Sequence, residues 1–334
     1  MTKQIPPTQY SLTILSRDAH VYATLFTQLL AADPTIPVTL DCVACDPHAI
    51  NSAQAKGTHI LLADPNIASQ VIASMPNLQW CQSTWAGNAP LLTHPKQDYM
   101  LTGVKGIFSQ LMSEYVLSYI LAYIRQHDAF AQLQTQSQWH PPTLTSMTEY
   151  TIGIMGMGNI AQGMLPVFDA LQANVIGLSH SGKTLTSHPH LTMYSSEYKA
   201  EFLTHCDVLV NLLPETKQTQ GFITHTDLMS RHAQRPSNSR GLLFVNAGRG
   251  SVISDECVYR SLQEGLLDQA VLDVFSQEPL PSDSPLWTHP QVKITQHTAA
   301  ISTPERVMSV VSDNLTLFIN HRPLNFTLDP ITGY

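Results

Sequence analysis

An α/β architecture built on parallel sheets is the fold class that this sequence predicts. Short apolar runs alternate with helical patterns along most of the chain, a glycine turn joins one run to a helix at residues 151–161, and the length of 334 residues provides for two cores. Strands that alternate with helices are typical of a parallel sheet covered on both faces. A chain of this length favours two domains.

The first hundred residues form the first alternating series. Gly57 and Pro65 are turn signals on either side of the third predicted strand. The predicted helices are residues 18–32 and 67–74, and the predicted strands are residues 11–16, 38–44, 59–63, 78–83 and 99–102. Residues 109–125 then repeat apolar side chains at intervals of three and four. This spacing predicts a long helix that can pass into the next domain, and a polar amphipathic tail follows it to Trp139.

The second series begins at Tyr150. It predicts strands at residues 150–155, 174–178, 208–213, 242–246, 270–274 and 292–295, with helices that include residues 159–171 and 254–265. Thr303 caps a last helix, Pro304 fills its first position, and the helix runs to about residue 320. Because this helix follows the completed second series, we expect it to return to the first domain. The expected domains are therefore residues 1–105 with 298–334, and residues 106–297.

Composition and charge exclude several classes of function. The net charge is −8 and no basic run is present, so no nucleic-acid partner is expected. The most apolar helical stretch, residues 115–124, is too short to span a bilayer, and the first residues lack the apolar core of a signal peptide. No membrane partner and a cytoplasmic location are expected. Five scattered cysteines, with Cys42 and Cys45 in a predicted strand, indicate neither a disulfide framework nor a metal site.

Residues 151–161 carry the glycine turn, with Gly156, Gly158 and Ala161 in the places of a G-x-G-x-x-G/A pattern. Gly156 permits a tight turn, Gly158 lets the backbone approach a pyrophosphate, and Ala161 lets the helix pack closely on the strand. The start of the helix offers unpaired N–H groups and a partial positive charge to the phosphate. Between two predicted strands, this motif predicts a dinucleotide site.

Polar residues follow three later strands of the second series, at residues 246–250, 273–279 and 296–300. In an open parallel sheet, ligands bind beyond the carboxyl ends of the strands. We therefore expect these three segments to meet at one crevice.

With these motifs in this order, the chain resembles the D-isomer-specific 2-hydroxyacid dehydrogenases, and most closely their glyoxylate/hydroxypyruvate reductase A branch. The resemblance is firm from about residue 110 to residue 310 and includes residues 212–219, 246–250, 272–279 and 284–290. It implies two Rossmann-like domains, one a flavodoxin-like substrate domain and one a dinucleotide-binding domain, and a homodimer built through the latter. The implied reaction is the NADPH-dependent reduction of a small 2-oxo acid, such as glyoxylate or hydroxypyruvate, to the D-2-hydroxy acid.

The resemblance assigns three side chains to this reaction. Arg249 matches the family arginine, whose rigid donor fork suits the carboxylate and keto oxygen of a 2-oxo acid. His297 matches the acid/base histidine, and imidazole can supply the proton that a ketone needs as hydride reaches its carbon. Glu278 matches the carboxylate that pairs with this histidine and orients its ring. Asp273, at the same strand end, is expected to face the nicotinamide amide.

The resemblance also supplies the binding residues. Residues 83–88 match the family loop whose backbone amides hold the substrate carboxylate, with Trp85, Ala86 and Gly87 as the expected contacts. Trp85 either narrows the pocket toward small or apolar-tipped substrates or only packs in its loop. Trp139 matches a tryptophan in the segment that crosses to the partner subunit. The residues expected at the cofactor, besides Arg249, Asp273 and His297, are Met112, Gly156, Gly158, Asn159, Ile160, His180, Ser181, Lys183, Leu213, Pro214, Thr219, Ala247 and Gly248.

The expected cofactor is NADPH, with NADH as the alternative. A site for NAD normally has an acid at the end of the second strand, about 20 residues beyond the glycines. Here His180 holds that place, and Ser181 and Lys183 supply a hydroxyl donor and a positive charge that favour a 2′-phosphate. The other interpretation is a solvated Lys183 without a ligand, since this loop contains no arginine.

Two features depart from the family pattern. Gln296 takes the place of a usual proline, which is expected to loosen the strand end, and residues 232–240 are expected to form an exposed insertion. Two other functions stay open. One is an NAD-dependent dehydrogenase of the D-lactate or D-phosphoglycerate type, and the other is a non-catalytic NAD(H)-sensing protein like the corepressors that share this fold. Such a sensor would bind the dinucleotide and turn over poorly.

Overall fold

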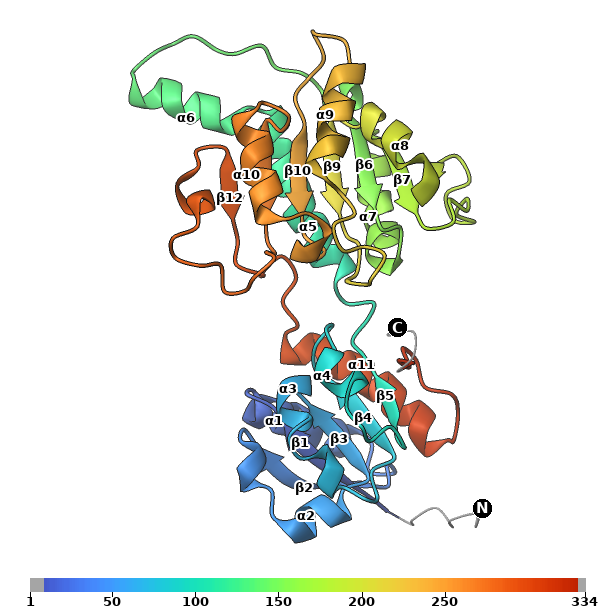
Figure 1. The fold of residues 1–334 in the computed structure, drawn as a ribbon. Coiled ribbons are helices and arrows are strands. Elements are labelled where there is room, and N and C mark those ends of the chain that lie inside the picture. Colours follow the sequence, from blue (N-terminus) through green and yellow to red (C-terminus); the bar gives the residue numbers. More distant parts are fainter. Residues whose placement is uncertain (1–8, 330–334) are drawn as a thin grey trace. The chain divides into compact units, whose positions relative to one another are not determined.

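The computed structural model describes residues 9–329, which divide into two compact units (Figure 1). Unit 1 comprises the described residues up to Ile107 and those from Ser302 onward, and unit 2 runs from Phe108 to Ile301. These limits lie two and four residues beyond the expected boundaries at 105/106 and 297/298. The ends of the expected first domain, residues 1–8 and 330–334, lie outside the described residues.

Unit 1 contains a five-stranded parallel sheet in the order β2-β1-β3-β4-β5. This is the flavodoxin-like order, in which the direction of chain winding reverses between β1 and β3. The strands are β1 (Tyr10–Leu15), β2 (Val38–Ala44), β3 (Ile60–Ala63), β4 (Trp80–Ser83) and β5 (Met100–Thr102).

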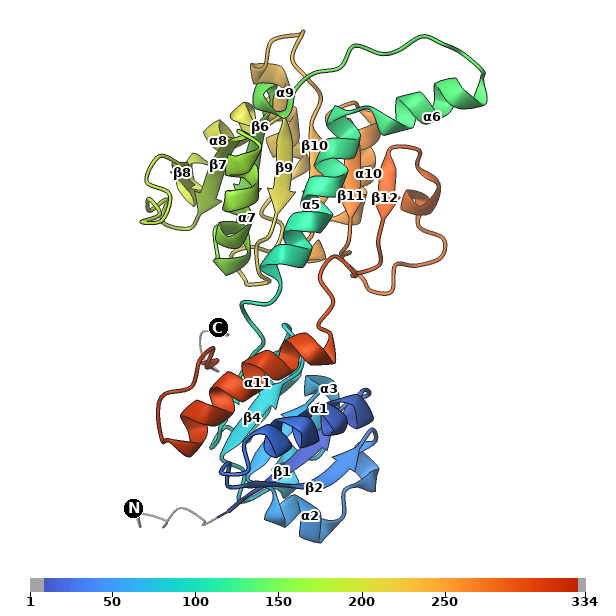
Figure 2. The same cartoon turned by 180° about the vertical axis from the view of Figure 1, so that it is seen from behind.

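Helices cover both faces of this sheet (Figures 1 and 2). One face carries α1 (Ala19–Ala32) and α11 (Pro304–Ile319), and the other carries α2 (Ser52–Gly57), α3 (Pro65–Ala68) and α4 (Ala89–Leu92). The single helix expected at residues 67–74 is wrong. Instead, α3 ends at Ala68 and residues Ile72–Ser74 form a separate 3₁₀ turn, because Val71 leaves the helical region with φ −123° and ψ −19°.

The last helix shares the core of the first strands. The ring of Phe318 on α11 lies 5.0 Å from the ring of Tyr10 and 5.3 Å from that of Trp80. The buried Asn314 amide donates to Gln82 Oε1 at 3.1 Å and accepts from the backbone N–H of Asn325 at 2.8 Å. Residues from the two ends of the chain therefore complete one core.

Unit 2 contains a seven-stranded sheet in the order β12-β11-β10-β9-β6-β7-β8, in which every pair is parallel. The winding reverses between β6 and β9, which is the place where such sheets bind ligands. The strands are β6 (Thr151–Met155), β7 (Asn174–Ser179), β8 (Thr192–Ser195), β9 (Val208–Asn211), β10 (Leu243–Asn246), β11 (Gln269–Leu272) and β12 (Val292–Ile294). The two parallel sheets with helices on both faces confirm the predicted α/β architecture.

Two helices, α5 (Ser109–Ile124) and α7 (Asn159–Ala170), cover one face of this sheet, and α8 (Lys199–His205), α9 (His225–Gln234) and α10 (Asp255–Gln263) cover the other (Figures 1 and 2). The apolar stripe of α5 is buried in a core with α7. The chain then turns at Gln126, whose φ is +54°, into α6 (His127–Thr135). No residue of α6 is buried, and the helix extends away from the sheet of unit 2. No helix among residues 9–329 is long and apolar enough to cross a membrane.

The expected exposed insertion at residues 232–240 is wrong in part. Its first three residues belong to α9, and two of its arginines are tied to acids in other segments. Arg235 pairs with Asp207 at 2.6 Å, and Arg240 pairs with Glu149 at 3.2 Å. These contacts join residues distant in sequence, so the polar composition of the segment did not reveal them.

Candidate active site

The glycine turn lies at the reversal point of the sheet in unit 2. Gly156 has φ +94°, and a Cβ there would lie 2.9 Å from the backbone of Leu212, so both conformation and space require glycine. Gly158 has open space within 4 Å of its would-be Cβ, and it begins α7 without a side-chain cap. The first N–H groups of α7 therefore stay available for a ligand. Open space, uncapped N–H groups and a tight turn fit the pyrophosphate of a dinucleotide.

The loop after β7 presents three exposed polar side chains, those of His180, Ser181 and Lys183. The hydroxyl of Ser179 accepts a hydrogen bond from the N–H of Gly182 at 3.1 Å. An isolated antiparallel β-bridge between Ser181 and Ser195 also holds the loop. Within the described chain, Lys183 forms no ion pair. Its charge is therefore free to meet an anion.

The other expected cofactor residues lie at neighbouring strand ends, with one exception. Gly248, after β10, approaches the loop after β9 so closely that a Cβ would lie 2.8 Å from Leu213 O. In that loop, the Thr219 hydroxyl donates to Pro214 O at 2.6 Å. Met112 is the exception, because its side chain is only 5% exposed and lies in the core between α5 and α7. A contact of Met112 with the cofactor stays a prediction.

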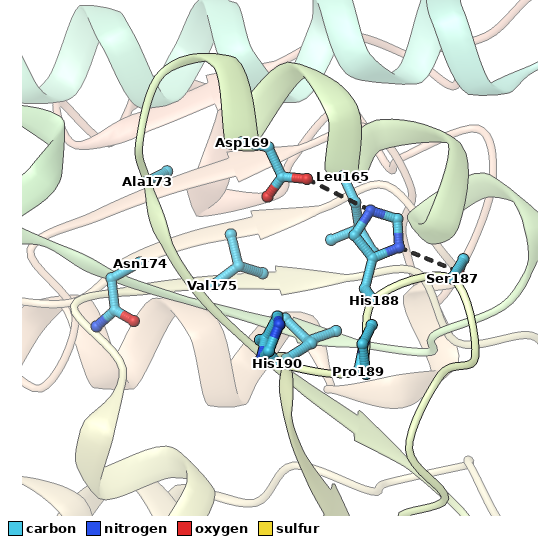
Figure 3. Close-up of a pocket in the computed structure, with 10 residues that line it drawn as sticks. Leu165, Asp169, Ala173, Asn174, Val175, Ser187, His188, Pro189 and His190 are labelled. Atoms are coloured by element: carbon cyan, nitrogen blue, oxygen red, sulfur yellow. Dashed lines mark hydrogen bonds and ion pairs between the residues drawn. The ribbon is translucent and has the colours of Figure 1, made fainter.

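A pocket of about 340 Å³ opens beside α7, at the start of β7 rather than its end (Figure 3). In it, His188 lies 3.4 Å from Asp169 on α7 and 3.0 Å from the hydroxyl of Ser187. The contact with Asp169 ties the segment that follows Lys183 to α7. His190 also lines the pocket, but no group of three or more potential ligands among the described residues could hold a metal. The contact between His188 and Asp169 therefore helps to hold the loop after β7, and the pocket contains no residue of the expected site.

The structure brings His297 and Glu278 together. Nδ1 of His297 lies 2.8 Å from Oε2 of Glu278, whose Oε1 accepts from the backbone N–H of Phe275 at 3.1 Å. The two side chains are 52% and 38% exposed. Nε2 of His297 has no hydrogen-bond partner within the described chain. One nitrogen is thus held by the carboxylate while the other has no partner within the described chain, as proton transfer to a ligand requires.

Arg249 lies on the neighbouring strand end. Its half-buried guanidinium donates to Gly248 O at 2.7 Å, and none of the described acids forms an ion pair with it. The next residue, Gly250, packs against the segment that carries Glu278, because a Cβ there would overlap the backbone carbonyl of Phe275. The segments that carry Arg249, Glu278 and His297 follow β10, β11 and β12, which are adjacent in the sheet.

Asp273 organises the loop that carries His297. Its carboxylate, on a side chain only 2% exposed, accepts from the hydroxyl of Thr295 at 2.6 Å, the N–H of Thr298 at 2.7 Å and the N–H of Ala299 at 3.1 Å. The Tyr115 hydroxyl lies 2.8 Å from that of Thr295. Burial raises the pKa of Tyr115. Because the Thr295 hydroxyl donates its hydrogen bond to Asp273, the Tyr115 hydroxyl is the donor to Thr295. The partners of Asp273 are thus loop groups, and its expected contact with the nicotinamide amide stays a prediction.

Gln296 and His297 are both left-handed, with φ +56° and +59°. Non-glycine residues adopt this conformation at a cost, and they persist there only when surrounding contacts hold them. The N–H of His297 donates to Asp273 O at 2.6 Å, which supplies such a contact. Proline fixes φ near −65° and is incompatible with this turn. Glutamine at position 296 thus permits a turn that the usual family residue forbids.

The expected substrate loop lies in unit 1, after β4. Ser83 accepts from the N–H of Trp85 at 3.1 Å, and the Asn88 amide donates to Trp85 O at 3.3 Å and Ala86 O at 3.1 Å. Within the described chain, the N–H groups of Ala86 and Gly87 form no hydrogen bond. A loop whose carbonyls are held inward and whose amides are unpaired can bind a carboxylate.

Comparison with known proteins adds independent evidence. Residues 117–299 match the family model of the D-isomer-specific 2-hydroxyacid dehydrogenase NAD-binding domain. The chain is 35% identical over 227 residues to the glyoxylate/hydroxypyruvate reductase A of Serratia proteamaculans, covering 68% of this chain and 69% of that protein.

Solved structures are similar over nearly the whole chain. A D-isomer-specific 2-hydroxyacid dehydrogenase family protein from Aeromonas salmonicida matches with a TM-score of 0.81 and 32% identity, over 96% of this chain and 99% of that one. An NADPH-dependent glyoxylate/hydroxypyruvate reductase from Sinorhizobium meliloti, solved with NADP and sulfate, matches with a TM-score of 0.81 and 27% identity, over 98% of this chain and 100% of that one.

Proposed function

Because the chain belongs to the family of D-isomer-specific 2-hydroxyacid dehydrogenases, and is therefore an NAD(P)-dependent oxidoreductase, we propose that it reduces glyoxylate or hydroxypyruvate to the 2-hydroxy acid with NADPH. The observation that carries this proposal is the pair of His297 and Glu278, 2.8 Å apart, with Nε2 of the histidine unpartnered within the described chain. The names of the similar proteins from Serratia and Sinorhizobium support the substrate class and the cofactor.

Each residue of the site has a task in this reaction. When bound, the reduced nicotinamide supplies the hydride that adds to the carbonyl carbon of the substrate. Arg249 binds the substrate carboxylate and keto oxygen through its planar donor fork. His297 donates the proton from Nε2 to the same oxygen, which becomes the hydroxyl of the product. Glu278 holds Nδ1 and stabilises the charged imidazolium before the transfer. The free amides of Ala86 and Gly87 bind the substrate carboxylate.

The choice of cofactor rests on the loop at residues 180–183. Lys183 and Ser181 are exposed, and no acid stands at the place that normally binds a ribose 2′-hydroxyl. A carboxylate there would repel a 2′-phosphate, whereas a lysine attracts it.

We expect initial rates measured with glyoxylate and hydroxypyruvate to show a kcat/KM for NADPH at least about 10-fold above that for NADH, which is the worth of one charge-assisted contact. Lys183→Ala should narrow this ratio by raising the KM for NADPH alone. Lys56→Ala, which removes an exposed lysine from unit 1, is the matched control. Equal use of NADH would contradict the cofactor assignment. Cofactor binding without turnover of any 2-oxo acid would favour the sensing protein instead.

We further propose that the protein is a homodimer joined through unit 2. No residue of α6 is buried, Phe130 on α6 is 39% exposed, and Trp139 beyond it is 99% exposed. A subunit mass is 36.9 kDa, so light scattering should give about twice this value. The double substitution of Phe130 and Trp139 by serine should shift the mass toward that of the monomer, whereas Met229→Ser, at another exposed apolar residue, should not. A monomeric wild-type protein would refute the dimer.

A further inference from the structure

One buried carboxylate joins three strand ends in unit 1. Asp64 follows β3 and is only 2% exposed. It accepts from the Ser16 hydroxyl at 2.8 Å and the Arg17 N–H at 3.0 Å, both after β1, and from the Thr84 hydroxyl, after β4. These ends lie at the edge from which α3 and α4 start (Figure 1). Because the winding reverses between β1 and β3, this edge is where a flavodoxin-like sheet binds ligands.

Arg17 is presented at this edge in a defined position. Its guanidinium carbon lies 5.2 Å from the centroid of the Trp85 ring, so the cation is stacked on a residue of the substrate loop. The backbone of Arg17 is held by Asp64, while its side chain is exposed. Stacking uses only the flat face of a guanidinium and leaves the N–H donors at its rim available.

The charge of Arg17 is not paired with an acidic group of the described chain. Among the arginines of the described chain, only Arg17, Arg125 and Arg322 have guanidinium groups without a hydrogen bond or an ion pair. Arg17 is the one of these three that stacks on an aromatic ring. The carboxylate that holds the backbone of Arg17, that of Asp64, already accepts three hydrogen bonds. Asp18, the next residue, is exposed and forms no ion pair with it.

We propose that Arg17 and Trp85 form a subsite for an anionic group at the distal end of the substrate, so that 2-oxo acids with a second carboxylate or a phosphate ester are better substrates than glyoxylate. The inference rests on the proposed function, in which the amides of Ala86 and Gly87 hold the first carboxylate. It replaces the expectation that Trp85 selects small or apolar-tipped substrates, because the guanidinium of Arg17 is stacked on the Trp85 ring. Arg17 determines specificity and takes no part in the transfer of hydride or proton.

The test compares Arg17→Ala, Arg17→Lys and wild-type protein, with NADPH and with glyoxylate, oxaloacetate and 3-phosphohydroxypyruvate as substrates. Arg17→Ala should lower kcat/KM for oxaloacetate or 3-phosphohydroxypyruvate by about 10-fold or more, mainly through KM, because a charge-assisted contact is lost. The value for glyoxylate, which has no distal group, should change by less than about 3-fold. Arg17→Lys should recover part of the loss. The substrate whose kcat/KM falls more in Arg17→Ala, oxaloacetate or 3-phosphohydroxypyruvate, shows whether the subsite prefers a carboxylate or a phosphate.

Arg322→Ala removes an equally exposed and unpaired arginine from unit 1 and should leave all three substrates unchanged. A calorimetric titration of D-malate into each protein with NADP⁺ measures the subsite without turnover. If no 2-oxo acid is reduced, the proposed function fails, and weaker malate binding by Arg17→Ala alone would still support the subsite. Equal malate binding by wild-type protein and Arg17→Ala, no malate binding by either, or unchanged ratios of kcat/KM among the substrates, would overturn it.

Discussion

Replacement of His297 by asparagine is expected to lower kcat for glyoxylate by about 100-fold to 10,000-fold, the range that a positioned general acid contributes. The imidazole is held at Nδ1 by Glu278, 2.8 Å away, and presents Nε2 as its free proton donor. An amide cannot donate a proton to the developing alkoxide. Asparagine tolerates the left-handed conformation of this residue, φ +59°, so the loop should keep its shape. Stopped-flow measurement of a single turnover would isolate the chemical step.

Two further variants test whether the loss of kcat is specific to the imidazole of His297. His321→Asn changes another left-handed histidine, φ +54°, outside the expected site, and should leave kcat unchanged. Glu278→Gln keeps an oxygen for the N–H of Phe275 but loses the negative charge beside His297, so kcat should fall less, by about 10-fold. Binding of NADPH, followed by its fluorescence, should be preserved in all of them. A His297→Asn protein with more than a tenth of the wild-type kcat would rule out the histidine as the proton donor.

Substitution of Gly250 by alanine is expected to destabilise unit 2 by about 3 kcal/mol or more, at the upper end of the cost of overpacking a core. The added Cβ would overlap the backbone carbonyl of Phe275, and a backbone atom cannot rotate away as the end of a side chain can. Relief requires a shift between the segment after β10 and the segment that carries Glu278. Urea denaturation followed by circular dichroism should therefore show a lower midpoint, together with lost activity.

Gly158→Ala provides the contrast within the same unit. A Cβ at Gly158 meets nothing within 4 Å, and alanine in place of glycine at this N-cap position costs about 1 kcal/mol or less. Its urea midpoint should stay close to that of the wild-type protein, while its affinity for NADPH should fall because the methyl group occupies the space proposed for the pyrophosphate. An unchanged midpoint for Gly250→Ala would show that the two segments move apart at little cost.

The sequence predicted the fold well because strands buried on both faces are read as continuous apolar runs. The expected strand at residues 242–246 contains β10, whose four residues are all buried, and the glycine turn lies between β6 and α7, as its pattern indicates. The short helices and strands were harder to predict, because a segment of four to six residues is too short to show a repeating apolar pattern. For this reason α2 and β8 were missed, and α3 and the 3₁₀ turn at Ile72–Ser74 were predicted as one helix.

Only those residues of the site that belong to recognisable sequence motifs could be predicted. The pairing of Glu278 with His297 follows from motif order, but the partners of Asp273 do not. They depend on the left-handed turn at Gln296 and His297, which brings the N–H groups of the following residues toward the carboxylate, and no glycine marks that turn in the sequence. An acid directly after a buried strand, such as Asp64, is a signal that could have been used.

The return of α11 to the first sheet has a consequence for synthesis on the ribosome. Tyr10 and Trp80 emerge early, but Phe318, which covers them, emerges only after all of unit 2 has been made. The contiguous unit 2 can fold while the part of the unit 1 sheet that α11 covers, beside α1, is still exposed to contact with other chains. A nascent chain interrupted before residue 302 would thus contain a complete unit 2 and an incomplete unit 1 with exposed apolar surface. We expect such a product to aggregate and be degraded rather than persist as a weak enzyme.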